Sequence, residues 1–205
     1  DQINSIDAFG NVRMERADNL SGRADQLHYD GRKEVMNLIG NVSITKDNRT
    51  LTSQAIDYYV PSNTGKYTSN GRLEDPKNVL TSIVGEYNFN TDNAVFTNNV
   101  DLVNSRDNYV IHTNKLLYNT RTNIAKLVEE AEITSDENKI ITSNGDYNTA
   151  TEKANLYVKN GVQPKLFAKD DRALEGDSIH YDRHTGEGTA IGNVTVNDPK
   201  HHAIL

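Results

Sequence analysis

The sequence has no cysteine and no tryptophan, and only four of its 205 residues are proline. Without cysteine the chain can form no disulfide, no thiolate nucleophile and no cysteine-ligated zinc site. No apolar run approaches the ~20 residues that a transmembrane helix needs, so we expect no membrane-spanning helix. The scarcity of proline leaves nearly the whole backbone free to pair in strands.

The chain is acidic, with 29 Asp and Glu residues against 22 Lys and Arg residues and a formal net charge of -7. A nucleic-acid-binding surface needs a basic face, so we expect no nucleic-acid partner. Only 35% of the residues are hydrophobic, which predicts a narrow apolar layer in place of a thick globular core.

Turn-forming residues are abundant, with 26 asparagines and 13 glycines. Asn and Gly tolerate the left-handed backbone that tight hairpin turns require. No sustained apolar stripe at i, i+3, i+4 and i+7 favours a helix. The composition therefore predicts an all-β fold with many turns.

Two sequence features recur with a period of about 30 residues, which indicates internal repeats. The first is a tyrosine, with an apolar or glycine residue two positions before it and a small residue five positions before it. The tyrosines of this series are Tyr29, Tyr58, Tyr87, Tyr118, Tyr147 and Tyr181. The second feature is a Gly-Asn-Val-like segment between successive tyrosines, as at Gly10-Asn11-Val12, Gly40-Asn41-Val42 and Gly192-Asn193-Val194.

Each repeat predicts two strands whose apolar residues lie on one face. In Val42-Ser43-Ile44, for example, a polar residue separates two apolar ones, as on a strand with one buried side. The parity of the apolar positions changes between the small residue five before each tyrosine and the residue two before it, which predicts a bulge or corner. The Gly-Asn pair predicts a kink in the other strand. A single repeat cannot bury its apolar face alone, so the repeats are expected to stack into one domain spanning residues 1–205.

No constellation of residues favours catalysis, so we predict no enzyme activity, no catalytic residue, no metal and no cofactor. The six histidines are scattered, and His180 and His184 flank a charged stretch that reads best as a hairpin turn. Their role stays open at this point. Each repeat tyrosine is expected to pack inside as part of the core, although such a ladder could also border a groove for an apolar ligand.

The repeat pattern resembles the OstA-like family, the periplasmic lipopolysaccharide-transport proteins of LptA type. The segment from Gly40-Asn41-Val42-Ser43-Ile44 through Leu51, Ser53 and Ile56 to Tyr58 carries the resemblance most fully. The same pattern runs from about Ala8 to Val196. The resemblance implies an elongated, open, V-shaped β-jellyroll of antiparallel strands stacked along one axis and built from about six ~30-residue repeats.

The resemblance also implies a function, which is to carry lipopolysaccharide towards the outer membrane with the lipid A acyl chains in an apolar interior. Copies of the chain, or other members of the family, would join through their edge strands. The protein would lie in the periplasm, its signal peptide removed or outside this sequence. The candidate interior lining consists of Leu38, Ile44, Ile56, Phe96, Leu102, Leu116, Leu127 and Ile133.

Two other functions remain open from the sequence. A stacked β-solenoid can serve as a structural or adhesive protein that has no ligand. A β-helix enzyme that acts on polysaccharide is also built from repeated strands, but it needs a cluster of Asp, Arg or Lys on one face of successive coils, and the repeats show none.

Overall fold

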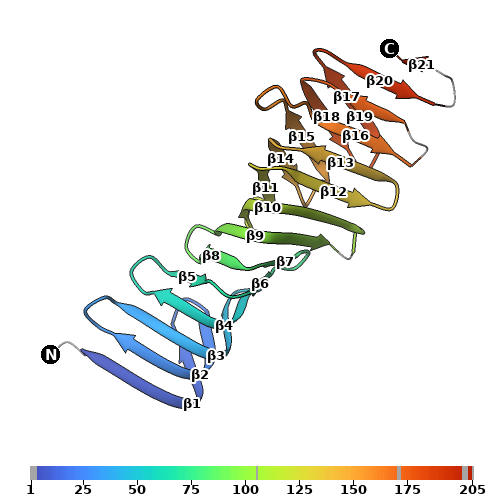
Figure 1. Ribbon diagram of the computed structural model, residues 1–205. Coiled ribbons are helices and arrows are strands. Elements are labelled where there is room, and N and C mark those ends of the chain that lie inside the picture. The colour runs from blue at the N-terminus through green and yellow to red at the C-terminus, as the bar shows by residue number, and fades with distance from the viewer. Residues whose placement is uncertain (1–3, 105, 170–171, 200–202, 205) are drawn as a thin grey trace. The chain divides into compact units, whose positions relative to one another are not determined.

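The computed structural model describes residues 4–104, 106–169, 172–199 and 203–204, and within them it contains 21 strands and no helix (Figure 1). Accordingly, none of the described segments is a helix that could cross a membrane. The chain divides into two compact units, Asp1–Asn98 and Asn99–Leu205. The predicted all-β fold of antiparallel strands is confirmed, whereas the predicted single domain over residues 1–205 stays a prediction.

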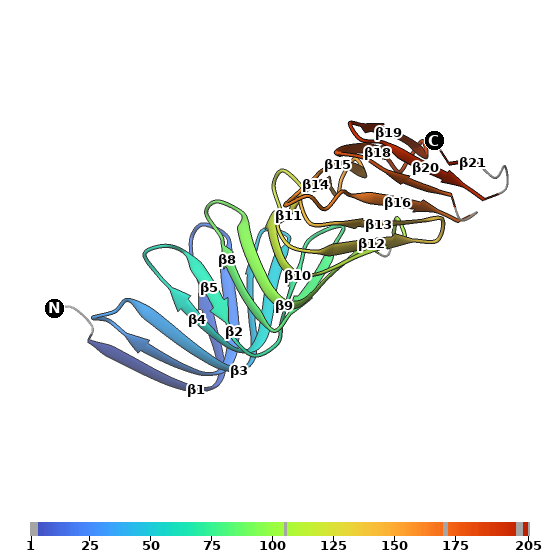
Figure 2. The same cartoon turned by 45° about the horizontal axis from the view of Figure 1, so that its top comes forward.

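In unit 1 the first four strands are long and each contributes to two sheet arms, whereas the next four are short and each lies in one arm. Its strands are β1 (Ser5–Glu15), β2 (Leu20–Asp30), β3 (Val35–Lys46), β4 (Arg49–Tyr59), β5 (Thr64–Tyr67), β6 (Gly71–Glu74), β7 (Val79–Ser82), β8 (Val84–Asn88) and the first half of β9 (Asn93–Asn104). Arm A comprises β6, β7 and one half of each of β1–β4, while arm B comprises β5, β8, the first half of β9 and the other halves of β1–β4. Figure 2 shows these strands, in blue to green, bending so that the two arms face each other.

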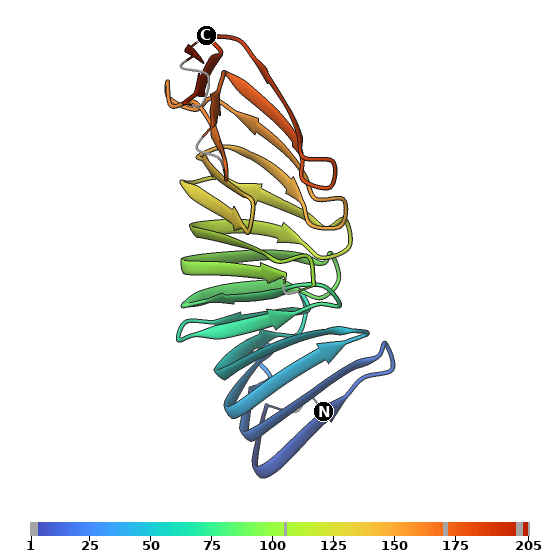
Figure 3. The same cartoon turned by 90° about the vertical axis from the view of Figure 1, so that its right-hand side faces the viewer.

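Unit 2 repeats this plan with shorter strands. After the second half of β9 come β10 (Tyr109–Asn119), β11 (Ile124–Leu127), β12 (Ala131–Ser135), β13 (Asn138–Thr142), β14 (Gly145–Asn148), β15 (Lys153–Tyr157), β16 (Lys165–Ala168), β17 (Ala173–Glu175), β18 (Ser178–Asp182), β19 (Glu187–Ile191), β20 (Thr195–Asp198) and β21 (Ala203–Ile204). Its arm A runs through β10, β12, β13, β16, β17 and β20, and its arm B through β10, β11, β14, β15, β18 and β19. Within each unit, Figure 3 shows the strands lying side by side.

The Gly-Asn segments form the corner at which the arms meet. Gly40 and Asn41 have φ angles of 78° and 48°, so two consecutive residues adopt the left-handed conformation. The register between β3 and β4 shifts between Ile39 and Val42, at this same pair. Gly10-Asn11 and Gly192-Asn193 have the same left-handed geometry. The bulge or corner that the change of parity predicts is therefore confirmed, and left-handed backbone explains why Gly and Asn recur there.

The small residue five positions before each repeat tyrosine faces this corner. The Ser53 hydroxyl donates to the carbonyl of Asn70 at 2.8 Å, and the Thr113 hydroxyl donates to the carbonyl of Glu130 at 2.7 Å. A hydroxyl at this position therefore satisfies a corner carbonyl that the strand ladder leaves over. The hairpin turns of arm B, at the end away from the corner, depend on the residue that follows each repeat tyrosine.

In five of the six repeat hairpins, the residue after the tyrosine folds its side chain over the turn. The Asn148 Oδ1 accepts the N–H groups of Ala150 and Thr151, at 2.9 and 3.0 Å. The same pair of bonds occurs at Asp30, Asn88, Asn119 and Asp182. Five residues after every repeat tyrosine, the backbone is left-handed, at Glu34, Asn63, Asp92, Asn123, Glu152 and Gly186. Turn chemistry thus repeats with the same period as the core.

The core of each unit lies between its two arms. The repeat tyrosines Tyr58, Tyr87, Tyr118 and Tyr147 are fully buried there, which confirms that the rings pack inside. In unit 1, the rings of Tyr87 and Phe89 meet edge to face with their centroids 4.7 Å apart. In unit 2, Tyr109 and Tyr147 make a similar contact at 5.2 Å.

Candidate functional site

Four of the candidate lining residues belong to unit 1 and lie on the inner faces of its arms. Leu38, Ile56 and Phe96 come from arm B, and Ile44 comes from arm A. Leu38 and Ile56 are direct cross-strand partners. The structure therefore places all four in the inward register that the sequence alternation predicts.

The other four candidates line unit 2. Leu116 and Leu127 are cross-strand partners in arm B, whereas Leu102 and Ile133 lie on arm A. Across both units, none of the eight side chains is more than 4% exposed. That these residues bind a ligand stays a prediction. Their burial limits the routes by which a ligand could reach them. The interior is filled by the protein's own side chains, so a ligand reaches these residues only where the arms separate or end.

The terminal strands leave part of this inward register uncovered. In β1, Ile6 lies opposite Tyr29 in the inward register but is 43% exposed, because no further strand pairs with β1 among the described residues. Val194, just before β20, is 40% exposed. The two ends of the chain thus present apolar positions that elsewhere are covered by a neighbouring strand.

In unit 1, side-chain contacts tie together the tips of the two arms on the side opposite the corner, which we call the mouth. From arm A, the Arg16 guanidinium donates to the Tyr58 hydroxyl at 3.1 Å and to Asn63 Oδ1 at 3.0 Å. Lys46 donates to the carbonyl of Phe89 at 3.2 Å. We call these contacts the unit 1 clasp. An ion pair between Arg49 and Asp92 also belongs to it.

Arg49 Nη1 lies 3.9 Å from Asp92 Oδ1 and completes the unit 1 clasp. Arg49 projects from the first residue of β4 in arm A, and Asp92 lies in the turn between β8 and β9 in arm B. A second carboxylate, Asp18, lies 3.2 Å from Arg16 and 3.6 Å from Lys46. The clasp is therefore polar on its outer side and adjoins the apolar core on its inner side.

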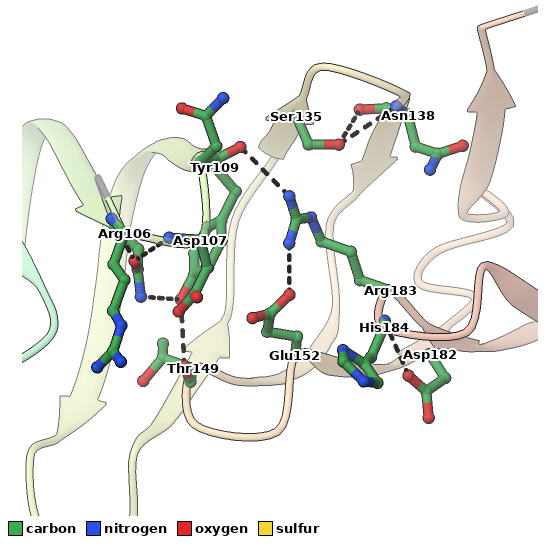
Figure 4. A network of polar contacts seen from close by, with 12 residues as sticks. Arg106, Asp107, Tyr109, Ser135, Asn138, Thr149, Glu152, Asp182, Arg183 and His184 are labelled. Carbon is green, nitrogen blue, oxygen red and sulfur yellow. Dashed lines mark hydrogen bonds and ion pairs between the residues drawn. The ribbon is translucent and has the colours of Figure 1, made fainter.

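The mouth of unit 2 is tied by a different set of side chains, shown in Figure 4. Arg183 forms an ion pair with Glu152, donates to the carbonyl of Asn108 at 3.4 Å and lies over the Tyr109 ring at 5.7 Å. Tyr109 in turn donates to the carbonyl of Thr149 at 3.4 Å. These contacts join the start of β10 in arm A to the hairpin turns of arm B.

A cavity of about 310 Å³ opens beside Arg183 at the mouth of unit 2. Its lining residues are mostly polar or charged: Asp107, Ser135, Glu137, Asn138, Glu152, Arg183 and His184. Three of them are acids and one is an arginine already paired with an acid. The cavity therefore does not suit an apolar chain or an anionic group.

His28 and His180 each contact a cross-strand partner on the outer face. The His180 Nδ1 lies 2.8 Å from Asn155 Oδ1, its direct cross-strand partner, and the His28 Nδ1 lies 2.7 Å from Asp7 Oδ1 in the same arrangement. His184 lines the unit 2 cavity, apart from His180. Among the described residues, no group of three or more His, Cys, Asp or Glu side chains could hold a metal ion.

The interior tyrosines are held in their neutral form by their surroundings. Burial raises the pKa of Tyr67 to about 12, against a small opposing effect of its hydrogen bond with Ser82. Burial also raises the pKa of Tyr58, which the positive charge of Arg16 partly counteracts. Neutral tyrosines add no charge to the apolar interior, which favours an apolar ligand.

Sequence reasoning did not identify the two clasps. Arg16 and Lys46 share one place in the 30-residue pattern, six positions after the glycine of a Gly-Asn-Val segment, but Arg49 does not. Their partners across the mouth lie up to 47 residues away in the chain. The sequence did hold one signal for the clasps, the turn position five residues after each tyrosine, where the structure has left-handed backbone. At Asn63 and Asp92 this residue accepts the hydrogen bond of its own tyrosine and also meets a cation from arm A.

Comparison with known proteins bears on the repeat pattern. The sequence model of the OstA-like protein family matches residues 1–109 and 105–171. A search of curated protein sequences found no match. A solved structure, that of LptH, the LptA-homologous periplasmic component of the lipopolysaccharide transport device of Pseudomonas aeruginosa, is similar at 12% identity and a TM-score of 0.27. That similarity covers 89% of this chain and 99% of the LptH chain.

The family assignment rests on the sequence match, which spans well over half of the chain. It agrees with the repeated Gly-Asn corners and inward tyrosines, which the structure shows to be the elements that shape each unit. This chain belongs to the OstA-like protein family.

Proposed function

We propose that this protein carries lipopolysaccharide in the periplasm towards the outer membrane, with the lipid A acyl chains held between the arms of its units. The observation that carries the proposal is the repeated inward register, in which eight apolar lining positions share one continuous pattern and are all buried. Membership of the OstA-like family supports it. A polar outer surface would keep such a carrier dissolved while its interior matches the acyl chains.

A photo-crosslinking experiment tests the proposal. A photoreactive amino acid is placed at Leu38 or Leu116 in the interior, and at Ser43 or Glu132, which lie on outer faces, as matched controls. We expect crosslinks to lipopolysaccharide at the interior positions only. Crosslinks confined to the outer positions would contradict the proposal, as would the absence of any lipid on native protein purified from the cell and analysed by mass spectrometry.

Assembly through the end strands is part of the same proposal. The unpaired backbone of β1 and its partly exposed apolar positions offer an edge to which a second copy, or another OstA-like protein, can add a strand. Chains joined in this way would pass lipid from one to the next. We expect concentration-dependent association in sedimentation velocity experiments.

A structural or adhesive β-protein without a ligand is the second candidate. The observation that favours it is the full burial of the lining, which shows that the protein fills its own interior. This candidate predicts assembly through the ends but no lipid at any interior crosslinking position. Release of sugar from a glycan would instead indicate an enzyme, a function that we do not propose.

A further inference from the structure

Continuous backbone encloses the interior of unit 1 except at the mouth and the ends. Within each arm, neighbouring strands are joined by antiparallel ladders, as in the five consecutive pairs between β2 and β3 from Gln26 to Asp30. At the corner, four strands run from one arm to the other without a break. Opening the unit anywhere but at the mouth or the ends would therefore break backbone hydrogen bonds.

The unit 1 clasp joins the two arms across the mouth through side-chain contacts. In each of these contacts, one partner is a cationic side chain from arm A: Arg16, Lys46 or Arg49. The exposed fractions of these side chains are 42%, 22% and 20%, so water reaches all three. Polar contacts that water reaches are individually weak, and they can exchange one partner for another at small net cost.

The apolar core begins directly behind the clasp. Phe89, whose carbonyl accepts the Lys46 hydrogen bond, is buried, and so is Leu51. A Cβ added to Gly65 of arm B would lie 2.9 Å from Leu51 of arm A and 3.5 Å from Phe89, so glycine lets the two arms approach closely at this point. Separating the tips would therefore expose apolar surface at once, with cations along its rim.

Each of these cations is paired with a carboxylate, and Arg16 and Lys46 also donate to neutral oxygens. Arg16 donates to a tyrosine hydroxyl and an amide oxygen, and Lys46 donates to a backbone carbonyl. Asp18 and Asp92 supply the two carboxylates within reach. A phosphate or carboxylate group would be a stronger partner for Arg16 and Lys46 than these neutral oxygens, because charge-assisted hydrogen bonds are about twice as strong as neutral ones.

We propose that the mouth of unit 1 admits an acylated anionic lipid sideways, and that Arg16, Lys46 and Arg49 then exchange their present partners for its anionic headgroup. This inference rests on the proposed function and adds to it a route of access and a headgroup site. The acid-lined mouth cavity of unit 2 does not fit an anion. The headgroup site therefore belongs to unit 1.

A reversible lock across the mouth tests the route. Lys46 lies at the tip of arm A, and Asn90 is an exposed turn residue next to Phe89 in arm B. Because the native chain has no cysteine, a Lys46→Cys/Asn90→Cys variant offers only two thiols, which a bismaleimide with a cleavable disulfide spacer would join. The probe is fluorescent bisphosphorylated lipid A, and its association rate is measured by stopped flow.

Relative to the same variant before its thiols are joined, we expect the lock to slow lipid A association by tenfold or more, about 1.4 kcal/mol in the barrier. Reduction of the spacer should restore the rate of the unjoined variant, which already lacks the Lys46 cation. The matched control is Lys66→Cys/Glu86→Cys, joined in the same way. Lys66 and Glu86 are cross-strand partners on the outer face of arm B, with Lys66 Nζ 2.9 Å from Glu86 Oε2. Because both belong to one arm, joining them does not tie the two arms together. This control should bind at the rate of the unmodified protein.

The headgroup site has its own test. Arg16→Gln/Lys46→Gln should weaken binding of bisphosphorylated lipid A by tenfold or more, while binding of the same acylated lipid without phosphates should stay equal or improve. Arg72→Gln is the control, because Arg72 pairs with Glu74 on the outer face of arm A at 2.9 Å. Equal loss for both lipids would contradict the headgroup site, and circular dichroism checks that each variant is folded.

The outcomes separate this inference from the function on which it rests. If lipid crosslinks to Leu38 but the lock leaves the association rate unchanged, the lipid enters through the ends, and the mouth proposal is wrong while the carrier function stands. If the unmodified protein binds no lipid A at all, both are wrong. Slowing by the Lys66/Glu86 control as well would also contradict a specific role of the mouth.

Discussion

The hydroxyl groups of the buried tyrosines meet unequal surroundings, although the rings occupy equivalent positions. Tyr58 donates to Asn63, and Tyr87 donates to Asp92 at 3.1 Å. Tyr67 and Ser82 share a hydrogen bond at 2.7 Å. The Tyr147 hydroxyl is buried without a hydrogen-bond partner, because Arg183 holds Glu152, the residue five positions further on.

Removing single hydroxyl groups should expose this difference. Tyr147→Phe deletes a buried hydroxyl that forms no hydrogen bond, so the free energy of unfolding should stay the same or rise by up to about 1 kcal/mol. Tyr67→Phe deletes the bond to Ser82 and should lower it by about 1 kcal/mol. Urea denaturation measures both, and a clear loss of stability in Tyr147→Phe would show that its hydroxyl has a partner in solution.

The raised tyrosine pKa values also predict a loss of stability in alkali. Tyr67 has a pKa of about 12 in the folded chain and an ordinary value of 10.0. The folded state therefore holds this proton more tightly, so its contribution to stability is complete below pH 10 and is lost as the pH rises from 10 to 12.

This loss is measured as the urea midpoint between pH 9 and pH 12. Tyr67→Phe, which cannot ionise at this position, should show a shallower fall than the native protein over the same range. A native midpoint that is constant up to pH 12 would contradict the prediction. The two proteins are compared by the slope of the urea midpoint against pH, because the variant starts from a lower stability.

At the scale of single elements, the corner is the most demanding feature of the fold. Gly40 adopts a φ of 78°, and a Cβ there would lie 2.4 Å from Asp25 Oδ2. The Asp25 carboxylate in turn accepts a hydrogen bond from the Asn41 side chain at 2.9 Å. The same arrangement joins Asp177, Gly192 and Asn193, with an Asn–Asp distance of 2.8 Å.

Two glycine substitutions separate backbone strain from collision. Gly10 has a φ of 74°, yet a Cβ there would meet nothing within 4 Å. Gly10→Ala should cost about 1 kcal/mol, for the left-handed backbone alone. Gly40→Ala should cost about 2–3 kcal/mol, because Asp25 must also move. Thermal unfolding compares the two, and equal losses would mean that Asp25 moves aside freely.

At the scale of the whole chain, the ends differ from every interior strand. Ile6 lies in the inward register of β1 and is 43% exposed, whereas Met36, which lies opposite the same Tyr29 from β3, is half-buried. An edge strand with exposed apolar positions is prone to pair with another chain. The function proposed above uses this edge for assembly.

A charge at the exposed edge should weaken such assembly. Ile6→Glu would put a carboxylate on the face that a second chain must cover, and we expect its association constant to fall about tenfold or more. Val95→Glu is the matched control, since Val95 is exposed on the outer face of arm B. Sedimentation velocity at a series of concentrations measures both variants; equal association of Ile6→Glu and the native protein would exclude β1 as the interface.

Much of the fold could be read from the sequence because its signals are local and repeated. The alternation in Val42-Ser43-Ile44 fixes which side chains face inward, since successive residues of a strand point to opposite sides. The Gly40-Asn41 pair located the corner, because those two residue types tolerate left-handed backbone. Both features recur with the tyrosine period, and the structure has them at the predicted positions.

The sequence by itself thus determined the all-β fold, the repeat, the corners and the inward register of the lining. Only the tertiary structure decided that the interior is filled and that polar clasps close each mouth. The physical reason lies in the range of the interactions. Strand alternation and turn geometry involve residues a few positions apart, whereas Arg16 meets Asn63 and Arg183 meets Asn108 only after several strands have paired and brought the tips of the arms together.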